Sequence, residues 1–143
     1  MDVADQLPRI FQANIERFLQ RVVLVVLGQL PTHSALVTGQ AGSLDEFLKR
    51  CAEQVDNHTA AEAAKAFALT LDGLFERQLC RWAHAHGEKA NSMETALPAC
   101  ARLGALDLEA LGMADDLKEL HLVANVLRHG GGRSWTELQA RAP

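Results

Sequence analysis

Residues 67–82 read FALTLDGLFERQLCRW, and the spacing of the apolar residues in this stretch decides the fold class. The large apolar residues recur at steps of four, three and one: Phe67, Leu71, Leu74, Phe75, Leu79 and Trp82. Such steps place these side chains on one side of an α-helix, which has about 3.6 residues per turn. We therefore predict that the core helix of the protein runs through this stretch and ends near Gly87.

The N-terminal part of the chain has the same helical periodicity. Its apolar residues follow steps of four and three: Phe11, Ile15, Phe18, Val22 and Val25. The phase continues through the β-branched run at 22–26, which favours a helix there over a strand. Residues 31–42 are rich in Thr, Ser, Gly and Gln, so we expect a loop between this helix and the next one.

Capping boxes, in which a hydroxyl side chain precedes a glutamate by three residues, mark predicted helix starts. They begin at Ser43, Thr59 and Ser134. Residues 91–113 contain Pro98 and two glycines among short apolar pieces, which predicts short helices or turns before a long final helix that begins near Ala114. We find no convincing strand pattern. The sequence thus predicts an all-α fold, a single helical bundle of four to five principal helices that forms one domain over residues 1–143.

Composition narrows the functional classes. The chain has 143 residues, 48% of them hydrophobic, and a formal net charge of −4, which argues against a protein that coats nucleic acid indiscriminately. Its three cysteines are far apart and include no CxxC pair, so neither a disulfide framework nor a zinc knuckle is indicated: Cys51, Cys80 and Cys100. The apolar run at 22–27 is too short to span a bilayer, and we expect a cytoplasmic protein with no membrane partner.

The final helix carries the richest set of polar side chains. Residues 117–129 read LKELHLVANVLRH, and three glycines follow. An arc of about 100° holds five polar residues: Lys118, His121, Asn125, Arg128 and His129. His129 ends the helix, where the dipole favours its protonated form. A solvated polar face is one interpretation. Apolar residues flank the arc on both sides, however, which favours a helix covered from more than one direction and a polar crevice.

Two other groups of residues are candidates. Arg77, Arg81 and His84 share one helix face at steps of four and three, so they form either a cationic ridge or an exposed polar face. His84 and His86 could bind a metal together only where the helix has already unwound, since residues two apart diverge by about 200°. We assign no metal site and expect no cofactor.

Residues 117–130 resemble the signature helix of HEPN domains, a superfamily of small helical bundles found in bacterial toxins and antiviral nucleases. In that family an Arg is commonly followed by a polar residue, often Asn, and by a His four or five positions after the Arg. Asn125 and His129 stand at the matching places, and Ala124 stands at the arginine position. The stretch at 74–82 resembles, more loosely, the helix that precedes the signature helix in that family. The resemblance covers most of the chain in helix order and fourteen residues in motif detail.

The resemblance implies a metal-independent endoribonuclease of toxin or antiviral-defence type, which cleaves RNA by 2′-hydroxyl attack at the cleft of a homodimer. The implied catalytic residues are His129, Arg128 and Asn125. The implied substrate-binding residues are Lys118, His121, Arg77, Arg81 and Arg133. The implied partners are a second copy, an RNA substrate, and an antitoxin or other protein. The alternative is a catalytically silent helical dimer that acts as an interaction or regulatory module, which Ala124 and the acidic net charge favour.

Overall fold

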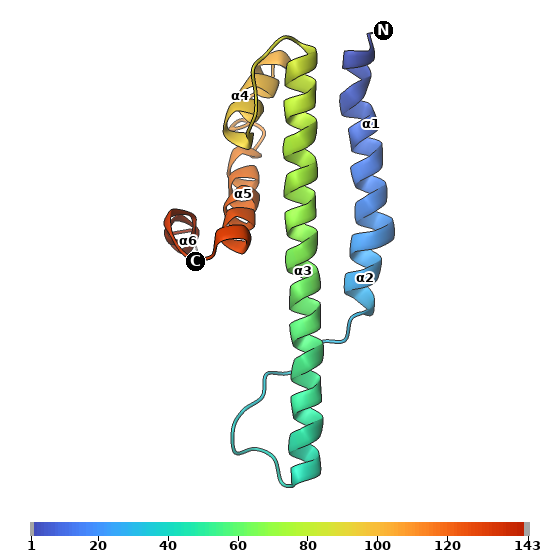
Figure 1. Ribbon diagram of the computed structural model, residues 1–143, viewed down its shortest axis with the longest axis vertical. Helices are drawn as coiled ribbons and strands as arrows, with labels where there is room; N and C mark the ends of the chain where they lie inside the picture. Colours follow the sequence, from blue (N-terminus) through green and yellow to red (C-terminus); the bar gives the residue numbers. More distant parts are fainter. Residues whose placement is uncertain (1, 142–143) are drawn as a thin grey trace. The chain divides into compact units, whose positions relative to one another are not determined.

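The computed structural model describes residues 2–141, and its regular elements are all helical (Figure 1). They are α1 (Val3–Phe18), the π-helical turn η1 (Leu19–Val23), α2 (Leu24–Gln29), α3 (Leu44–Ala85), α4 (Met93–Leu103), α5 (Ala114–His129) and α6 (Arg133–Gln139). No strand occurs in residues 2–141. The all-α fold class is therefore confirmed. Because α1, η1 and α2 follow one another without a break, they form one of five principal helical segments, within the predicted range.

The chain divides into two compact units. Unit 1 comprises Met1–Ile15 with Ala68–Pro143, and unit 2 comprises Glu16–Phe67. Helix α3 contributes its C-terminal part to unit 1 and its N-terminal part to unit 2. The single domain over residues 1–143 stays a prediction.

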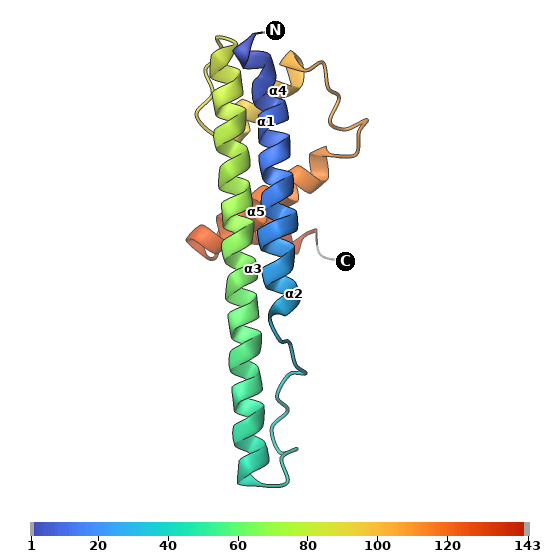
Figure 2. The same cartoon turned by 90° about the vertical axis from the view of Figure 1, so that its right-hand side faces the viewer.

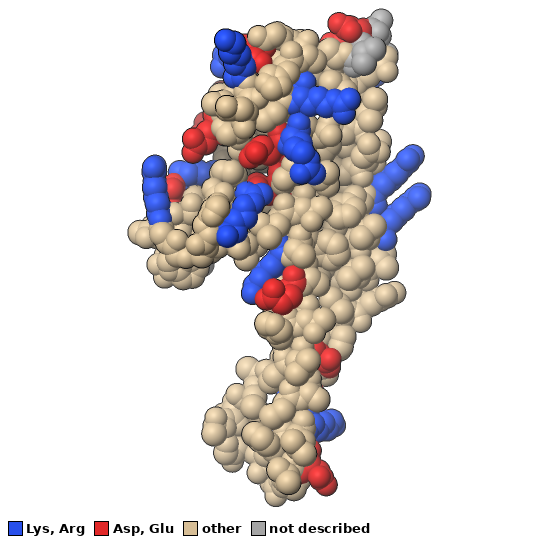
Figure 3. Space-filling model, viewed as in Figure 1, with Lys and Arg blue, Asp and Glu red and all other residues tan. Residues whose placement is uncertain are grey.

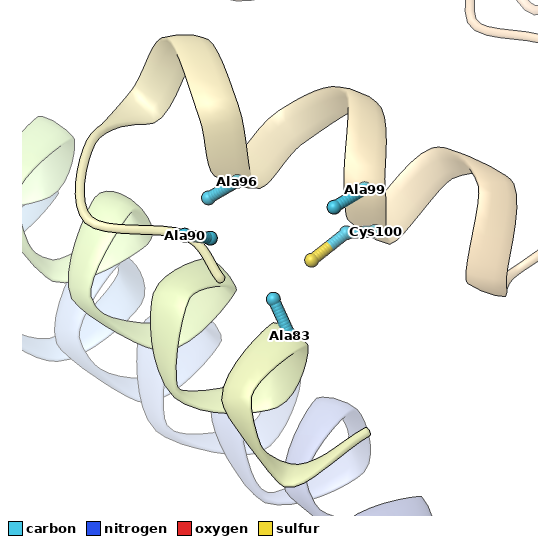
Figure 4. Packing of buried hydrophobic residues seen from close by; sticks show 5 residues of the cluster. All are labelled: Ala83, Ala90, Ala96, Ala99 and Cys100. Atoms are coloured by element: carbon cyan, nitrogen blue, oxygen red, sulfur yellow. The ribbon is translucent and has the colours of Figure 1, made fainter. Parts of the chain in front are cut away.

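Small side chains form the core of unit 1. Its core cluster lies where the end of α3 meets α4 (Figure 4): Ala83, Ala90, Ala96, Ala99 and Cys100. Small residues let two helix backbones approach closely. The thiol of Cys100 also donates a hydrogen bond to the carbonyl oxygen of Leu79, at 3.3 Å. On α1, Phe11 stacks on Phe75 of α3 with ring centroids 6.1 Å apart.

In unit 2 the helix that ends with α2 lies beside the middle of α3, and a loop continues from it along the first turns of α3 to the start of that helix (Figures 1 and 2). Phe18 meets Phe67 edge to face, with centroids 6.2 Å apart. The loop is tied to α3 by His33, whose N–H donates to Asn57 Oδ1 at 2.7 Å, while the Asn57 amide donates back to the His33 carbonyl at 3.0 Å. The helix through residues 22–26 and the loop at 31–42 are thus confirmed.

Of the predicted helix starts, the one at Thr59 is wrong, and the one at Ser134 is confirmed in place but not in its capping residue. Helix α3 is continuous through Thr59, whose hydroxyl donates to the carbonyl oxygen of Val55 at 2.9 Å and so is satisfied inside the helix. Helix α6 begins at Arg133 after Gly132, and no side chain caps it, so Ser134 is a helical residue. The start at Ser43 is confirmed, because the Glu46 N–H donates to Ser43 Oγ at 3.2 Å.

The predicted end of the core helix is confirmed. Helix α3 stops at Ala85, and Gly87 follows with a φ of +79°. The Glu88 N–H donates to the Ala83 carbonyl and the Gly87 N–H to the His84 carbonyl, both at 3.0 Å, which is the Schellman arrangement.

The predicted positions of the next helices are confirmed as well. Helix α4 occupies part of the region at 91–113, and α5 begins at Ala114. Ser92 and Thr95 form the capping box of α4, with a threonine in the position that a glutamate or glutamine commonly occupies. Among residues 2–141 no helix combines the length and the apolarity that crossing a bilayer requires.

Candidate functional site

A buried carboxylate joins α3 to α5. Asp72 on α3 is 0% exposed, and each of its oxygens is paired with a side chain of α5. His121 Nδ1 lies 3.3 Å from Asp72 Oδ1, and an Arg128 nitrogen donates to Asp72 Oδ2 at 2.8 Å. Residues seven apart lie on the same helix face two turns from each other, which lets both side chains reach one carboxylate. These two partners supply the hydrogen bonds and the positive charge that a buried carboxylate needs.

Asn125 completes the arrangement, and we call the four side chains Asp72, His121, Asn125 and Arg128 the Asp72 network. The Asn125 amide nitrogen lies 3.2 Å from His121 Nε2, and its oxygen accepts from Arg128 at 3.5 Å. Because the amide oxygen faces a guanidinium, the amide nitrogen is the group that donates to the imidazole. His121 Nε2 is then an acceptor, and Nδ1 carries the proton that is donated to Asp72. The network thus fixes the orientation of the His121 ring through contacts at both of its nitrogens.

The network borders a polar hollow of about 290 Å³ beside α5 and α6. His121 and Asn125 line it together with Lys118 and Arg133. Lys118 forms an ion pair with Glu137 of α6. The hydrogen bond from Lys118 is the main cause that lowers the pKa of Glu137 below its usual value, and the nearby charge of Arg133 adds to it. Four of the eight predicted site residues are therefore brought to one hollow.

His129 lies apart from the Asp72 network. It is the last residue of α5, it is exposed, and the chain turns at Gly130 with a φ of +74°. Within residues 2–141 no hydrogen bond or ion pair joins His129 to the network. Eight residues separate it from His121, a rise of about 12 Å along the helix. His121, and not His129, is the histidine that shares the Asp72 carboxylate with Arg128.

The arginines of the predicted ridge occupy a different hollow. Arg77, Arg81 and His84 line an open depression of about 660 Å³ on the C-terminal half of α3. In the described part of the chain neither arginine forms an ion pair with a carboxylate. Figure 3 shows lysine and arginine side chains gathered over this half of α3 and beside α5, with acidic side chains among them. Both guanidinium groups are available to an anion.

Helix α5 is covered from more than one direction, as the sequence predicts. Leu122 is 6% exposed and Ala124 is 0% exposed, and these residues belong to the two apolar arcs on either side of the polar arc. Ala124 also stands at the arginine position of the HEPN signature. This position lies in the core of unit 1, where a guanidinium would have no access to solvent.

Asp72 is not among the site residues predicted from the sequence. A signal for it exists, because Asp72 interrupts the apolar stretch at 67–82 from which the core helix was predicted. A charged residue inside a buried helix stretch needs a partner of opposite charge. The polar arc of the final helix contains the cationic candidates, but helix periodicity alone does not pair a residue on one helix with a residue on another.

The histidines near the end of α3 have other contacts. His84 Nε2 accepts a hydrogen bond from the Ala90 N–H at 3.4 Å, and His86 Nδ1 lies 3.0 Å from the Trp82 carbonyl. Among the residues that the structure describes, no group of three or more His, Cys, Asp or Glu side chains is arranged to hold a metal ion.

Comparison with known proteins adds no relative. No protein-family model, curated protein or solved structure matches the chain.

Proposed function

We propose that the chain cleaves RNA without a metal ion and that the Asp72 network forms the centre of its active site. One observation carries this proposal. The buried carboxylate of Asp72 holds His121 through Nδ1, at 3.3 Å, while the opposite nitrogen is an acceptor at the polar hollow. A neutral imidazole that is oriented by a carboxylate is the usual form of a general base.

The proposed reaction transfers the phosphoryl group from O5′ to O2′ within the RNA. The RNA 2′-hydroxyl attacks the adjacent phosphorus, so a bond between O2′ and phosphorus forms as the bond between phosphorus and O5′ breaks. His121 Nε2 takes the proton of the 2′-hydroxyl, and the protonated His121 of the second copy at the proposed cleft gives a proton to the departing O5′. The products are a 2′,3′-cyclic phosphate and a 5′-hydroxyl. No water or metal enters this balance.

The remaining side chains have supporting roles. Arg133 lines the hollow and stabilises the charge that develops on the phosphoryl oxygens. Asn125 hydrogen-bonds to His121 Nε2 in the free protein and yields this position to the hydroxyl of the substrate. Arg128 is a positioning residue, because it neutralises Asp72. Arg77 and Arg81 bind phosphates farther along the RNA.

This assignment differs from the roles that the HEPN resemblance implies in its proton-transfer residue, and it also makes Arg128 a positioning residue and gives charge stabilisation to Arg133. The resemblance gives proton transfer to His129, whereas the contacts of α5 favour His121 for that role. The toxin or defence setting, the antitoxin partner and the cleft between two copies rest on the resemblance alone, and they remain part of the proposal on that basis.

The test uses matched histidine variants on the same helix. Purified protein is incubated in EDTA with single-stranded and structured RNA, and with DNA of the same sequence as a substrate that lacks the 2′-hydroxyl. We expect RNA cleavage with cyclic phosphate ends, its loss in His121→Gln, and its retention in His129→Ala. Loss in His129→Ala alone returns the role to His129. No cleavage by the folded protein, or equal cleavage by all three forms, ends the nuclease proposal.

A catalytically silent module is the second candidate, and Ala124 favours it. Ala124 is fully buried, so an arginine at this position would place a charged side chain out of reach of water. The position therefore does not accommodate the arginine of the family signature. On this view the Asp72 network fixes α5 against α3 and has no reactive role. A stable dimer without nuclease activity would support the silent module.

A further inference from the structure

An apolar pocket of about 280 Å³ is formed entirely by residues of unit 1. Its walls come from α1, from the C-terminal part of α3, from α4 and from the start of α5. The lining includes Phe11 of α1, Phe75 of α3 and Leu97 of α4. None of the lining residues that the structure describes is charged. The pocket therefore suits an uncharged and mainly apolar molecule.

The turns between α4 and α5 complete the wall of the apolar pocket. Leu106, Leu108 and Met113 belong to this segment and line the pocket. Leu106 is 53% exposed and Met113 is 45% exposed, so these two side chains lie on its solvent side. A methionine side chain adapts its shape readily to a ligand. A ligand can thus enter past turns, without the opening of a helix.

One polar group in the wall of the apolar pocket lacks a partner. Trp82 lines the pocket, and its indole nitrogen is buried and forms no hydrogen bond in the described part of the chain. A buried indole N–H normally donates to an acceptor, and an unmet donor costs about 1–3 kcal/mol. The thiol of Cys100, which also lines the pocket, donates to the Leu79 carbonyl. The indole N–H is thus the donor that remains for a ligand.

Gln78 adds a second polar side chain to the lining. Residues four apart are neighbours on a helix surface, so Gln78 and Trp82 mark one end of the α3 wall as polar. The indole ring of Trp82 packs edge to face against His86, with ring centroids 5.2 Å apart. A broad apolar lining with a small number of hydrogen-bonding groups is the usual composition of a small-molecule site.

The volume of the apolar pocket limits the size of the ligand. An apolar cavity of about 150 Å³ in a protein core holds one benzene molecule. The pocket has nearly twice this volume, about 280 Å³, which corresponds to two fused aromatic rings. A single helical turn, about 11 Å wide and about 5.4 Å long, occupies roughly 500 Å³. The pocket therefore fits a small molecule and not a helix of a partner protein.

We propose that the apolar pocket binds a neutral bicyclic aromatic molecule with one carbonyl group, whose oxygen accepts a hydrogen bond from the Trp82 indole. An ionised ligand is disfavoured, because no lining side chain would neutralise its charge. A hydrocarbon of the same shape leaves the indole donor unmet, so the carbonyl increases the affinity. The pocket shares no residue with the Asp72 network, and the inference does not rest on the proposed nuclease function.

The first experiment measures the binding of prodan, a neutral naphthalene ketone whose fluorescence shifts to shorter wavelengths in apolar surroundings. Trp135→Phe leaves Trp82 as the only tryptophan, so energy transfer to prodan reports a ligand bound near this residue. We expect saturable binding of one prodan per chain, with a shift to shorter wavelengths. The absence of saturable binding overturns the proposal. A dimeric chain that excludes prodan assigns the pocket to a second copy and also overturns it.

Variants of two alanines locate the bound ligand. Ala101 lines the pocket, so the ring of Ala101→Phe occupies the space of the ligand. We expect prodan to bind this variant at least about tenfold more weakly, a loss of about 1.4 kcal/mol. Ala85→Phe is the matched control, because Ala85 is an exposed residue of α3 that does not line the pocket. Circular dichroism checks the helix content of both variants, and equal prodan binding by the two overturns the assignment to this pocket.

The second experiment isolates the hydrogen bond to the ligand. Trp82→Phe keeps an aromatic ring in the wall and removes the indole N–H. Naphthalene and acetylnaphthalene, which share the ring system and differ in the carbonyl, compete with directly excited prodan for each protein. We expect the preference for acetylnaphthalene over naphthalene to fall about two- to tenfold in Trp82→Phe. An unchanged preference overturns the role of the indole, even if both ligands bind the variant more weakly.

Discussion

Replacement of Arg128 by methionine tests whether the Asp72 network holds α5 on α3. The change keeps the apolar stem of the side chain and removes the guanidinium that pairs with Asp72 Oδ2 at 2.8 Å. Asp72 is 0% exposed and would keep only the contact with His121. The variant therefore has a buried carboxylate with half of its partners missing.

The expected loss follows from the burial of the two partners. Removal of one member of a buried ion pair costs about 3–5 kcal/mol. We expect about 3 kcal/mol for Arg128→Met, at the lower end, because His121 still donates to Asp72. Asp72→Asn should cost less, about 1–2 kcal/mol, since Arg128 is 33% exposed and water can hydrate it. The double variant should lose less than the sum of the two, by at least about 1 kcal/mol.

Urea unfolding measures these free energies. Both tryptophans, Trp82 and Trp135, lie in unit 1, so their fluorescence follows the unit that contains the network. Arg102→Met is the matched control, because Arg102 pairs with Glu88 at the surface and its loss should leave the midpoint unchanged. The reasoning is refuted if Arg128→Met behaves like this control, or if the effects of Arg128→Met and Asp72→Asn simply add.

Three further predictions concern other parts of the chain. Gly87→Ala should lower the free energy of unfolding by about 1 kcal/mol, since φ is +79° there, and an unchanged urea midpoint would contradict this. With Cys51 and Cys80 replaced by serine, the Cys100 thiol should react slowly with a disulfide reagent at neutral pH, because burial raises its pKa. The rate should rise with pH and on unfolding, and equal rates in native and unfolded protein would argue against it. Lys118→Met should raise the pKa of Glu137 in an NMR titration. The stabilisation from this pair is present above the ordinary glutamate pKa and is lost as the pH falls through the lowered value, so an identical titration in the variant would exclude the pairing.

The sequence determined the local structure of this protein. The apolar steps in residues 67–82 predicted the core helix, and Gly87 predicted its end, because a glycine with positive φ can close a helix without strain. The sequence also predicted the polar arc on α5, since a helix period of about 3.6 residues fixes which residues share a face. These are local properties, and neighbours in sequence decide them.

Tertiary packing decided the rest. Thr59 has the sequence of a helix start, but its hydroxyl bonds within a continuous α3. His121 and His129 lie on the same polar arc, and only the approach of α3 pairs His121 with Asp72, 49 residues away in the sequence. Helix periodicity fixes which side chains share a face, whereas the partner of a side chain depends on which helix packs against that face. The pairing of a buried carboxylate with groups on another helix is therefore settled only when both helices pack.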